Sequence, residues 1–250
     1  ISNKSARVIV YKGREKTDST SDTFGQTGYA IAFPNILKFV MSKVLGKEIF
    51  IGGRRQRETL YPEIAVREFL ANALIHQDFV ASGSRPTVEI FSDRMVIHNL
   101  GKPFTEPERL IDAPPRSRNE TLALFMTRAG HAEQRGSGYT RALNAIESAN
   151  QAPPLFQIID DSYVVTLFRT TDFAVMSKDD RIRACYQHAV LKYRRGDPMN
   201  NGSLRRRLGL KDTQASQVSN VIKDTVEAGM IKPLDPDQGN RNAKYVPFWA

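Results

Sequence analysis

Residues 67–79 of the chain read Arg-Glu-Phe-Leu-Ala-Asn-Ala-Leu-Ile-His-Gln-Asp-Phe. This stretch is apolar almost all the way round, which is typical of a buried helix, and Pro62 suits the first turn of such a helix. Glu68, Asn72 and His76 recur every four residues and therefore share one helix face. Buried polar groups need partners. The sequence therefore predicts a helix whose polar face lines a pocket for a polar ligand, with or without a metal ion.

The composition is that of an ordinary globular protein without membrane contact. The 250 residues are enough for one large domain or two modest ones. No apolar run approaches the roughly 20 residues of a membrane span, and the opening residues show no signal-peptide pattern. Cys185 is the single cysteine, which excludes an intrachain disulfide and suits a reducing cytoplasm. We therefore expect a cytoplasmic protein.

The positive charge is concentrated toward the end of the chain. Of the net charge of +9, residues 178–250 carry +6, from 14 Lys or Arg against 8 Asp or Glu. A small basic domain favours nucleic acid as a partner. A solvated, charged surface would give the same composition, so the charge alone leaves both readings open.

The pattern along the first 173 residues predicts an α+β layered domain. Residues 13–28 and 52–59 read as a loop and a connector, and the proline-rich segment 101–118 reads as a long loop of the kind that forms lids. Hydrophobic patterning predicts helices at 35–44, 62–77, 119–128 and 139–149, and strands at 7–11, 87–91, 95–99, 155–159 and 163–169.

The remaining residues predict a winged helix-turn-helix. Helices are expected at 180–195, 201–208 and 213–229, followed by short strands at 231–234 and 244–248. Amides on such a recognition helix can read base edges while Arg and Lys hold phosphates. The candidate DNA-binding residues are Arg205, Arg206, Arg207, Gln214, Gln217, Asn220, Lys223, Arg241 and Lys244. Winged helices also serve as dimerisation or protein-docking modules, and a homo-oligomer is left open.

Three motifs could meet at one phosphate-bearing ligand. The carboxylate of Glu68 and the amide oxygen of Asn72 are hard ligands suited to magnesium. The run Asn99-Leu100-Gly101 ends a strand with a glycine that allows close backbone approach. The run Gly136-Ser137-Gly138 enters a helix, and a helix N-terminus favours an anion.

In this order the motifs resemble the divergent GHKL-type ATPase domain of RecG-related transcriptional regulators. The resemblance covers most of residues 55–170 and is carried by 61–79, 93–101, 117–120 and 133–139. It implies a GHKL-like layered α/β sandwich followed by the winged helix. The implied domains are a leading segment 1–60, the nucleotide-binding domain 61–175 and the winged helix 176–250, with a Schlafen AlbA-type domain upstream of this chain.

The resemblance also implies ATP and Mg²⁺ as cofactors. Glu68 would polarise the attacking water, and Asn72 would be the magnesium ligand. Gly101 would belong to the adenine-side loop, together with Asn99, and residues 102–135 would be the ATP lid. The other implied nucleotide contacts are Arg118, Asn119, Gly136, Ser137 and Gly138. His76 and His98 are more simply read as supporting or structural histidines.

Two departures from the family pattern keep an alternative open. The family's Asp-x-Gly-x-Gly box reads Asn99-Leu100-Gly101-Lys102-Pro103 here, so an asparagine replaces the acid and a proline replaces the second glycine. These departures favour a non-catalytic DNA-binding regulator or scaffold with a degenerate pocket. Whether ATP is hydrolysed or only bound is open. No Gly-x-x-x-x-Gly-Lys-Ser/Thr loop occurs in the sequence, so its own motifs do not make it a helicase.

Overall fold

The structure is a computed structural model that describes residues 4–51, 54–81, 83–133, 136–169, 172–239 and 243–250. The chain forms two compact units. Unit 1 comprises residues 1–145 and 154–169, and unit 2 comprises residues 146–153 and 170–250. Among the described residues, no helix is both long and apolar enough to cross a membrane.

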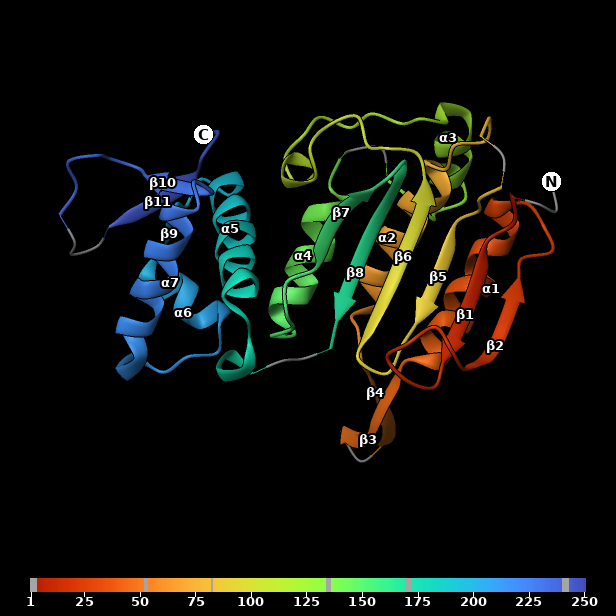
Figure 1. Ribbon diagram of the computed structural model, residues 1–250, viewed down its shortest axis with the longest axis horizontal. Helices are drawn as coiled ribbons and strands as arrows, with labels where there is room; N and C mark the ends of the chain where they lie inside the picture. The colour runs from red at the N-terminus through yellow and green to blue at the C-terminus, as the bar shows by residue number, and fades with distance from the viewer. Residues whose placement is uncertain (1–3, 52–53, 82, 134–135, 170–171, 240–242) are drawn as a thin grey trace. The chain divides into compact units, whose positions relative to one another are not determined.

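Unit 1 is built on a six-stranded sheet in the order β2-β1-β5-β6-β8-β7 (Figure 1). Strand β1 pairs in parallel with β5, whereas the other neighbours pair antiparallel. The strands predicted at 87–91 and 95–99 pair as the hairpin β5–β6, and those predicted at 155–159 and 163–169 pair as the hairpin β7–β8. The strands are β1 (Arg7–Tyr11), β2 (Ser19–Phe24), β5 (Thr87–Ile90), β6 (Arg94–Leu100), β7 (Leu155–Ile159) and β8 (Ser162–Phe168).

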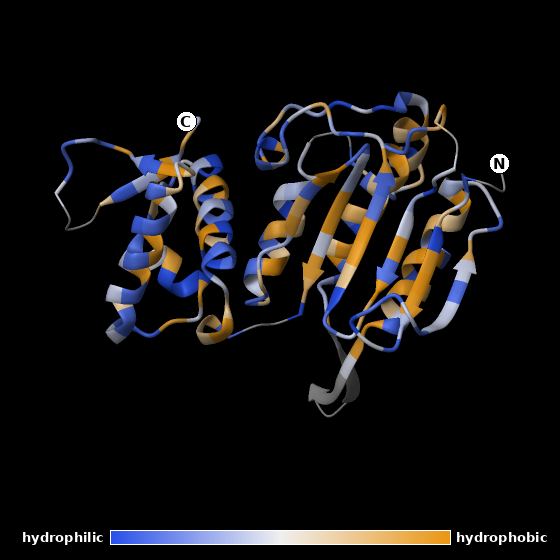
Figure 2. Cartoon of the chain, viewed as in Figure 1, coloured by the Kyte–Doolittle hydropathy of each residue, from blue (hydrophilic) through white to orange (hydrophobic). Residues whose placement is uncertain are grey.

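Helices pack on one face of this sheet, behind the strands in Figure 1. They are α1 (Tyr29–Lys43), α2 (Glu63–Ile75), α3 (Glu120–Arg128) and α4 (Gly138–Ser148). The core lies between the helices and the sheet, where Phe69 and Leu74 of α2 and Ile97 of β6 are almost completely buried. Figure 2 shows the hydrophobic residues along these strands and on the helices behind them. The layered α+β class expected from the sequence is therefore confirmed.

Two elements of unit 1 differ from the expectation. Strand β2 lies within 13–28, which was expected to be a loop. Its residues are polar up to Phe24 and most of its side chains are exposed, so no hydrophobic alternation marks it. Helix α1 begins at Tyr29, six residues before the expected start at Asn35. The prediction began after Pro34 because a proline usually marks a helix boundary, but Pro34 lies inside this helix.

A further hairpin lies where a connector was expected. Strand β4 (Arg54–Thr59) pairs antiparallel with β3 (Leu45–Ile51) in a separate two-stranded sheet. The expectation of a connector at 52–59 was therefore wrong for its described part, which is strand β4. The proline-rich segment 101–118 was expected to be a long loop, and within it the structure places one short 3₁₀ turn, Pro107–Arg109.

Unit 2 has the order helix, strand, helix, helix, strand, strand. Ser177 begins its first helix with a capping box to Asp180, and Asn200 begins its second helix in the same way with Ser203; such caps satisfy free backbone N–H groups. The three strands form one sheet in the order β10-β11-β9. The elements are α5 (Lys178–Arg194), β9 (Met199–Asn200), α6 (Asn201–Arg207), α7 (Ala215–Glu227), β10 (Ile231–Pro233) and β11 (Lys244–Pro247).

A buried ionic cluster lies within unit 2. The Arg207 side chain is 5 % exposed, and its Nε lies 3.2 Å from Oε1 of Glu147. Its Nη2 donates to the carbonyl of Gln151 at 2.9 Å. The ring of His188 lies between Glu147 Oε2, 3.0 Å from Nδ1, and Ser203 Oγ, 3.2 Å from Nε2. Helix α4 begins in unit 1, but its last turn, which contains Glu147, falls within residues 146–153 of unit 2.

Candidate functional site

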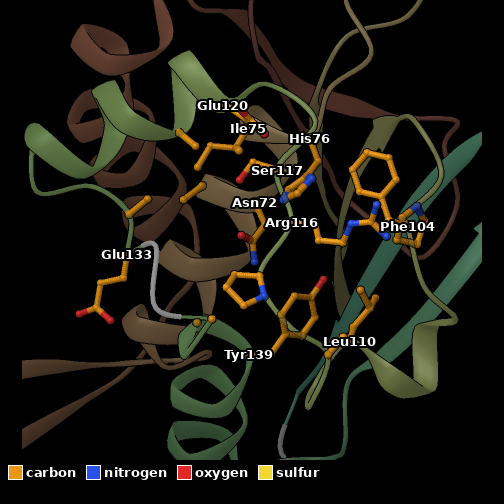
Figure 3. Close-up of a pocket in the computed structure, with 18 of the residues that line it drawn as sticks. Asn72, Ile75, His76, Phe104, Leu110, Arg116, Ser117, Glu120, Glu133 and Tyr139 are labelled. Carbon is orange, nitrogen blue, oxygen red and sulfur yellow. The ribbon is translucent and has the colours of Figure 1, made fainter.

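A cavity of about 990 Å³ opens in unit 1 between α2, the proline-rich segment and the first turn of α4. Figure 3 shows Asn72, His76 and Tyr139 pointing toward it. Its lining includes these sequence-predicted residues: Glu68, Asn72, Asn99, Gly101, Gly136 and Gly138. The fold thus brings together the three motifs, which are far apart in the sequence.

Helix α2 supplies the polar wall of the cavity. Asn72 and His76 lie on the cavity side of this otherwise buried helix. Burial and, to a smaller extent, the nearby Arg118 charge together lower the pKa of His76 to about 4. At neutral pH His76 is therefore an uncharged imidazole, which fits the supporting role expected for it.

The carboxylate of Glu68 is held by two arginines. Its Oε1 accepts hydrogen bonds from Arg141 Nη2 at 2.9 Å and from Arg67 Nη2 at 3.0 Å. The Glu68 side chain is only 4 % exposed. A buried carboxylate needs such partners. Glu68 thus lines the cavity as one member of an ion-pair cluster.

The glycine at position 138 makes room for this carboxylate. A Cβ placed on Gly138 would lie 2.8 Å from Glu68 Oε2, so a side chain there would displace the carboxylate. The carboxylate therefore lies against the first residue of α4, where the helix dipole favours negative charge.

The same cluster reaches the loop that precedes α4. Glu133 accepts from Ser137 Oγ at 2.7 Å and pairs with Arg141 Nη1 at 2.5 Å. Ser137 therefore holds Glu133, and it is not part of the cavity lining. A Cβ on Gly136 would lie 3.2 Å from Cδ of Pro115, so the proline-rich segment lies next to this loop.

The end of β6 forms another wall. Asn99 is 1 % exposed, and its Nδ2 donates to the carbonyl of Leu100 at 3.2 Å. Gly101 has a positive φ of 119°, and a Cβ there would lie 2.9 Å from the His76 carbonyl oxygen. Only a glycine lets the strand end this close to the end of α2.

Two tyrosines line the cavity beside Asn99. Tyr139 of α4 donates to the hydroxyl of Tyr163 of β8 at 2.9 Å. Burial raises the pKa of both phenols, so both are protonated at neutral pH. The Tyr163 hydroxyl oxygen accepts the hydrogen bond from Tyr139, so the O–H of Tyr163 can donate a hydrogen bond to another group. Neither tyrosine was assigned a role from the sequence: Tyr139 is the last residue of the segment 133–139, which was interpreted through its glycines, and Tyr163 lies outside the motifs.

Arg118 and Asn119 make contacts elsewhere. Asn119 Nδ2 donates to the carbonyls of Ile75 and Gln77, at 2.7 and 2.8 Å. These are carbonyls left free where α2 ends, so the side chain satisfies the helix terminus. Arg118 donates to the Lys102 carbonyl at 2.8 Å. The structure thus places both at the C-terminal end of the proline-rich segment, and neither is among the residues that line the cavity. Their implied contact with a nucleotide stays a prediction.

Among His, Cys, Asp and Glu side chains of the described residues, no group of three or more is placed to hold a metal ion. A magnesium ion in this cavity would therefore depend on Asn72 and on oxygens of the ligand. That pattern suits Mg²⁺, which keeps several waters and binds with substrate phosphates.

The candidate DNA-binding residues of unit 2 divide by exposure. Arg207 is buried in the ionic cluster, and Arg205 pairs with Asp212 at 2.7 Å. Gln214 caps the turn before α7 through the Lys211 N–H. Arg241 lies outside the described residues. The exposed candidates are Arg206, Gln217, Asn220, Lys223 and Lys244.

Residues 83–167 match a protein family described as "Putative ATP-dependent DNA helicase recG C-terminal". This is an ATPase-like domain family, and the match suggests nucleotide and metal use for the chain. The matched segment contains Asn99, Gly101 and the glycines before α4, whereas Glu68 and Asn72 precede it. No curated protein sequence matches the chain.

The fold is also similar to a solved bacterial structure, the DIP2311 protein from Corynebacterium diphtheriae. The TM-score is 0.62 at 16 % sequence identity. The match covers 98 % of this chain and 52 % of that chain, so the chain spans about half the length of its structural neighbour. At this identity the likeness concerns the fold.

Proposed function

We propose that this protein is a nucleotide-binding regulator, in which the cavity of unit 1 binds ATP with Mg²⁺ and unit 2 binds DNA. One observation carries the proposal: the Asn72 amide points from a buried helix into a cavity that also borders the N-terminus of α4. The match to an ATPase-like family over 83–167 supports it.

The cavity suits a nucleotide in size and chemistry. Its volume of about 990 Å³ lies at the upper end of the roughly 300–1,000 Å³ of ligand sites. Phe104, Leu110 and Ile75 offer apolar surface for a base or ribose. The N-terminus of α4 offers a positive dipole end to phosphates.

The roles of the protein's own groups follow from their positions. Asn72 would bind the magnesium ion, which would neutralise phosphate charge when it is bound. The segment 102–116 would cover the ligand and exclude water. Asn99 and the Tyr163 hydroxyl would form neutral hydrogen bonds at the strand ends, because neither carries a charge. This GHKL-like arrangement gives the protein a ligand-dependent state that a regulator needs.

Calorimetry with ATP and magnesium tests the nucleotide part. We expect wild type to bind ATP, and Asn72→Ala to bind at least about tenfold more weakly, which corresponds to about 1.4 kcal/mol. Chelating the metal should weaken wild type and change Asn72→Ala much less. Asn220→Ala is the matched control, because it makes the same substitution on exposed α7 of unit 2. If wild type gives no heat, the alternative of a DNA-binding scaffold with a degenerate pocket replaces this proposal.

The DNA part rests on the element order of unit 2, which is typical of a winged helix-turn-helix. Helix α7 would be the recognition helix, because Gln217, Asn220 and Lys223 are exposed on it. Arg206 and Lys244 would hold phosphates.

Fluorescence anisotropy with a labelled duplex at several salt concentrations tests this part. Arg206→Ala should weaken binding and reduce the salt slope by about 1. Arg128→Ala is the matched control, since it removes an exposed arginine from unit 1. A duplex that does not bind, or an equal slope for Arg206→Ala and wild type, would contradict DNA binding through this surface.

A further inference from the structure

The charges around the cavity bear on how it would hold the phosphates of a nucleotide. A triphosphate is a polyanion, and an anion that leaves water needs cationic partners. Among the described residues that line the cavity, Arg116 is the sole lysine or arginine. His76 also lines it, but its lowered pKa leaves the imidazole uncharged at neutral pH. Of the described side chains in the lining, Arg116 therefore brings the positive charge.

The carboxylates of the lining leave this charge available. Glu68 and Glu133 both pair with Arg141, at 2.9 and 2.5 Å. Glu120 is exposed at the start of α3, where water and salt screen its charge. Within the described part of the chain, Arg116 forms no ion pair with any carboxylate.

The Arg116 guanidinium rests on an aromatic ring. Its Cζ lies 5.2 Å from the ring centroid of Phe104, and Figure 3 shows the side chain running toward this ring. A cation–π contact at an exposed site is weak, whereas an arginine can bind phosphate oxygens through two parallel N–H groups. A phosphate within reach would therefore replace the ring as the partner of this guanidinium.

Arg118 differs from Arg116, although it follows two residues later in the sequence. Its Cζ also lies 5.2 Å from the Phe104 centroid. It donates to the Lys102 carbonyl at 2.8 Å and lies 3.8 Å from Oδ2 of Asp78. Arg118 therefore spends donors on holding the proline-rich segment, and Arg116 is the better phosphate ligand of the two.

Building on the proposed function, we propose that Arg116 binds the phosphate tail of the nucleotide, so that affinity rises with the number of phosphates. Arg116 belongs to the segment 102–116, which would cover the ligand. The same contact would hold this segment over the bound nucleotide. The cavity would then respond to ATP and hardly to the nucleoside.

Calorimetry with ATP, ADP and adenosine, each with magnesium, tests this role in the full chain. Wild type should bind ATP more tightly than ADP, and ADP more tightly than adenosine. Arg116→Gln should bind ATP at least about tenfold more weakly, as expected when a hydrogen bond to a charged group is lost, and should bind adenosine as wild type does. Its ATP affinity should also depend less on salt concentration, which a merely structural role of Arg116 would not produce.

Two further variants complete the comparison. Arg128→Gln is the matched control, since Arg128 is an exposed arginine of α3 outside the cavity lining; it should match wild type for every ligand. Arg116→Lys keeps the charge and loses the two parallel donors, so its ATP affinity should lie between those of wild type and Arg116→Gln.

Three results would overturn the proposal while leaving nucleotide binding intact. They are equal ATP affinities of wild type and Arg116→Gln, equal losses of ATP and adenosine binding in Arg116→Gln, and adenosine binding to wild type as tightly as ATP. Where adenosine binds too weakly to measure, an unchanged salt dependence of ATP binding in Arg116→Gln takes the place of the last two. If wild type binds none of the three ligands, the proposed function itself is refuted, and the role of Arg116 with it.

Discussion

Removing the Glu147 carboxylate should strongly destabilise unit 2. Glu147 lies beside Arg207, whose side chain is 5 % exposed, with Arg207 Nε 3.2 Å from Glu147 Oε1. In Glu147→Ala the guanidinium stays buried and keeps only the Gln151 carbonyl as its hydrogen-bond acceptor in this cluster. His188 also loses its carboxylate partner. Breaking a buried ion pair by removing one partner costs roughly 3–5 kcal/mol.

Tryptophan fluorescence during urea unfolding measures this cost. Trp249 is the single tryptophan of the chain, and its indole donates to the Tyr186 hydroxyl at 3.2 Å within unit 2. Its emission therefore reports on this unit. With a slope of about 1–3 kcal/mol per molar urea, a loss of 3 kcal/mol or more lowers the midpoint by at least about 1 M.

A surface glutamate provides the control. Glu227→Ala removes an exposed partner of Lys223, whose Nζ lies 3.7 Å away, and should cost about 0.3–0.5 kcal/mol. The double variant Glu147→Leu with Arg207→Met should recover much of the lost stability, because it leaves no unpaired charge. If Glu147→Ala shifts the midpoint no more than Glu227→Ala, the reasoning about the buried cluster is wrong.

Three further outcomes are expected. Burial lowers the pKa of His76 to about 4 from about 6.5 in the unfolded chain, so the unfolded chain binds more protons between pH 4 and 6.5. The free energy of unfolding should therefore fall by up to roughly 3 kcal/mol as the pH drops from 6.5 to 4. Thermal unfolding measured against pH tests this, and parallel profiles for wild type and His76→Gln would contradict it. Burial raises the pKa of Cys185 to about 12, so a thiol reagent at pH 8 should label the native protein only as fast as unit 2 opens; immediate labelling would show that the thiol is accessible. Gly138→Ala should lower the free energy of unfolding by about 1–3 kcal/mol, because its Cβ would lie 2.8 Å from Glu68 Oε2. Gly28→Ala is the control and should cost much less, since no atom lies within 4 Å of a Cβ at that position. Urea unfolding followed by circular dichroism measures both costs, and equal costs would mean that the Glu68 carboxylate moves freely.

The sequence predicted the parts of the fold that depend on local hydrophobic patterns. Helix α2 is apolar on nearly every side, and its polar residues recur every four positions, so both the helix and its cavity face could be inferred. The paired strands at β5–β6 and β7–β8 were predictable for the same reason. Strand β2 was missed because a polar edge strand with both faces exposed leaves no alternation.

The partners within the site could not be predicted. Arg141 lies 73 residues from Glu68 along the chain, and no local pattern relates the two. Asn119 illustrates the same limit. Its place in the lid next to an arginine predicted a contact with the nucleotide, whereas its side-chain amide donates hydrogen bonds to backbone carbonyls at the end of α2. Sequence patterns indicate which residues are polar and buried, but the identity of each partner comes from the tertiary fold.

The attachment of the proline-rich segment has a consequence for engineering. At one end, Leu100 accepts from the Asp78 N–H at 2.7 Å and donates to the Gln77 side chain at 3.1 Å. At the other end, Asn119 binds the carbonyls of Ile75 and Gln77. Both ends of the loop are thus fixed to one spot at the end of α2. The segment between these anchors can be lengthened at its exposed positions, because doubling a loop costs only about 0.6 kcal/mol, whereas Ile111 is buried and would be kept. The segment is therefore a natural place to graft a different lid and change what the cavity admits.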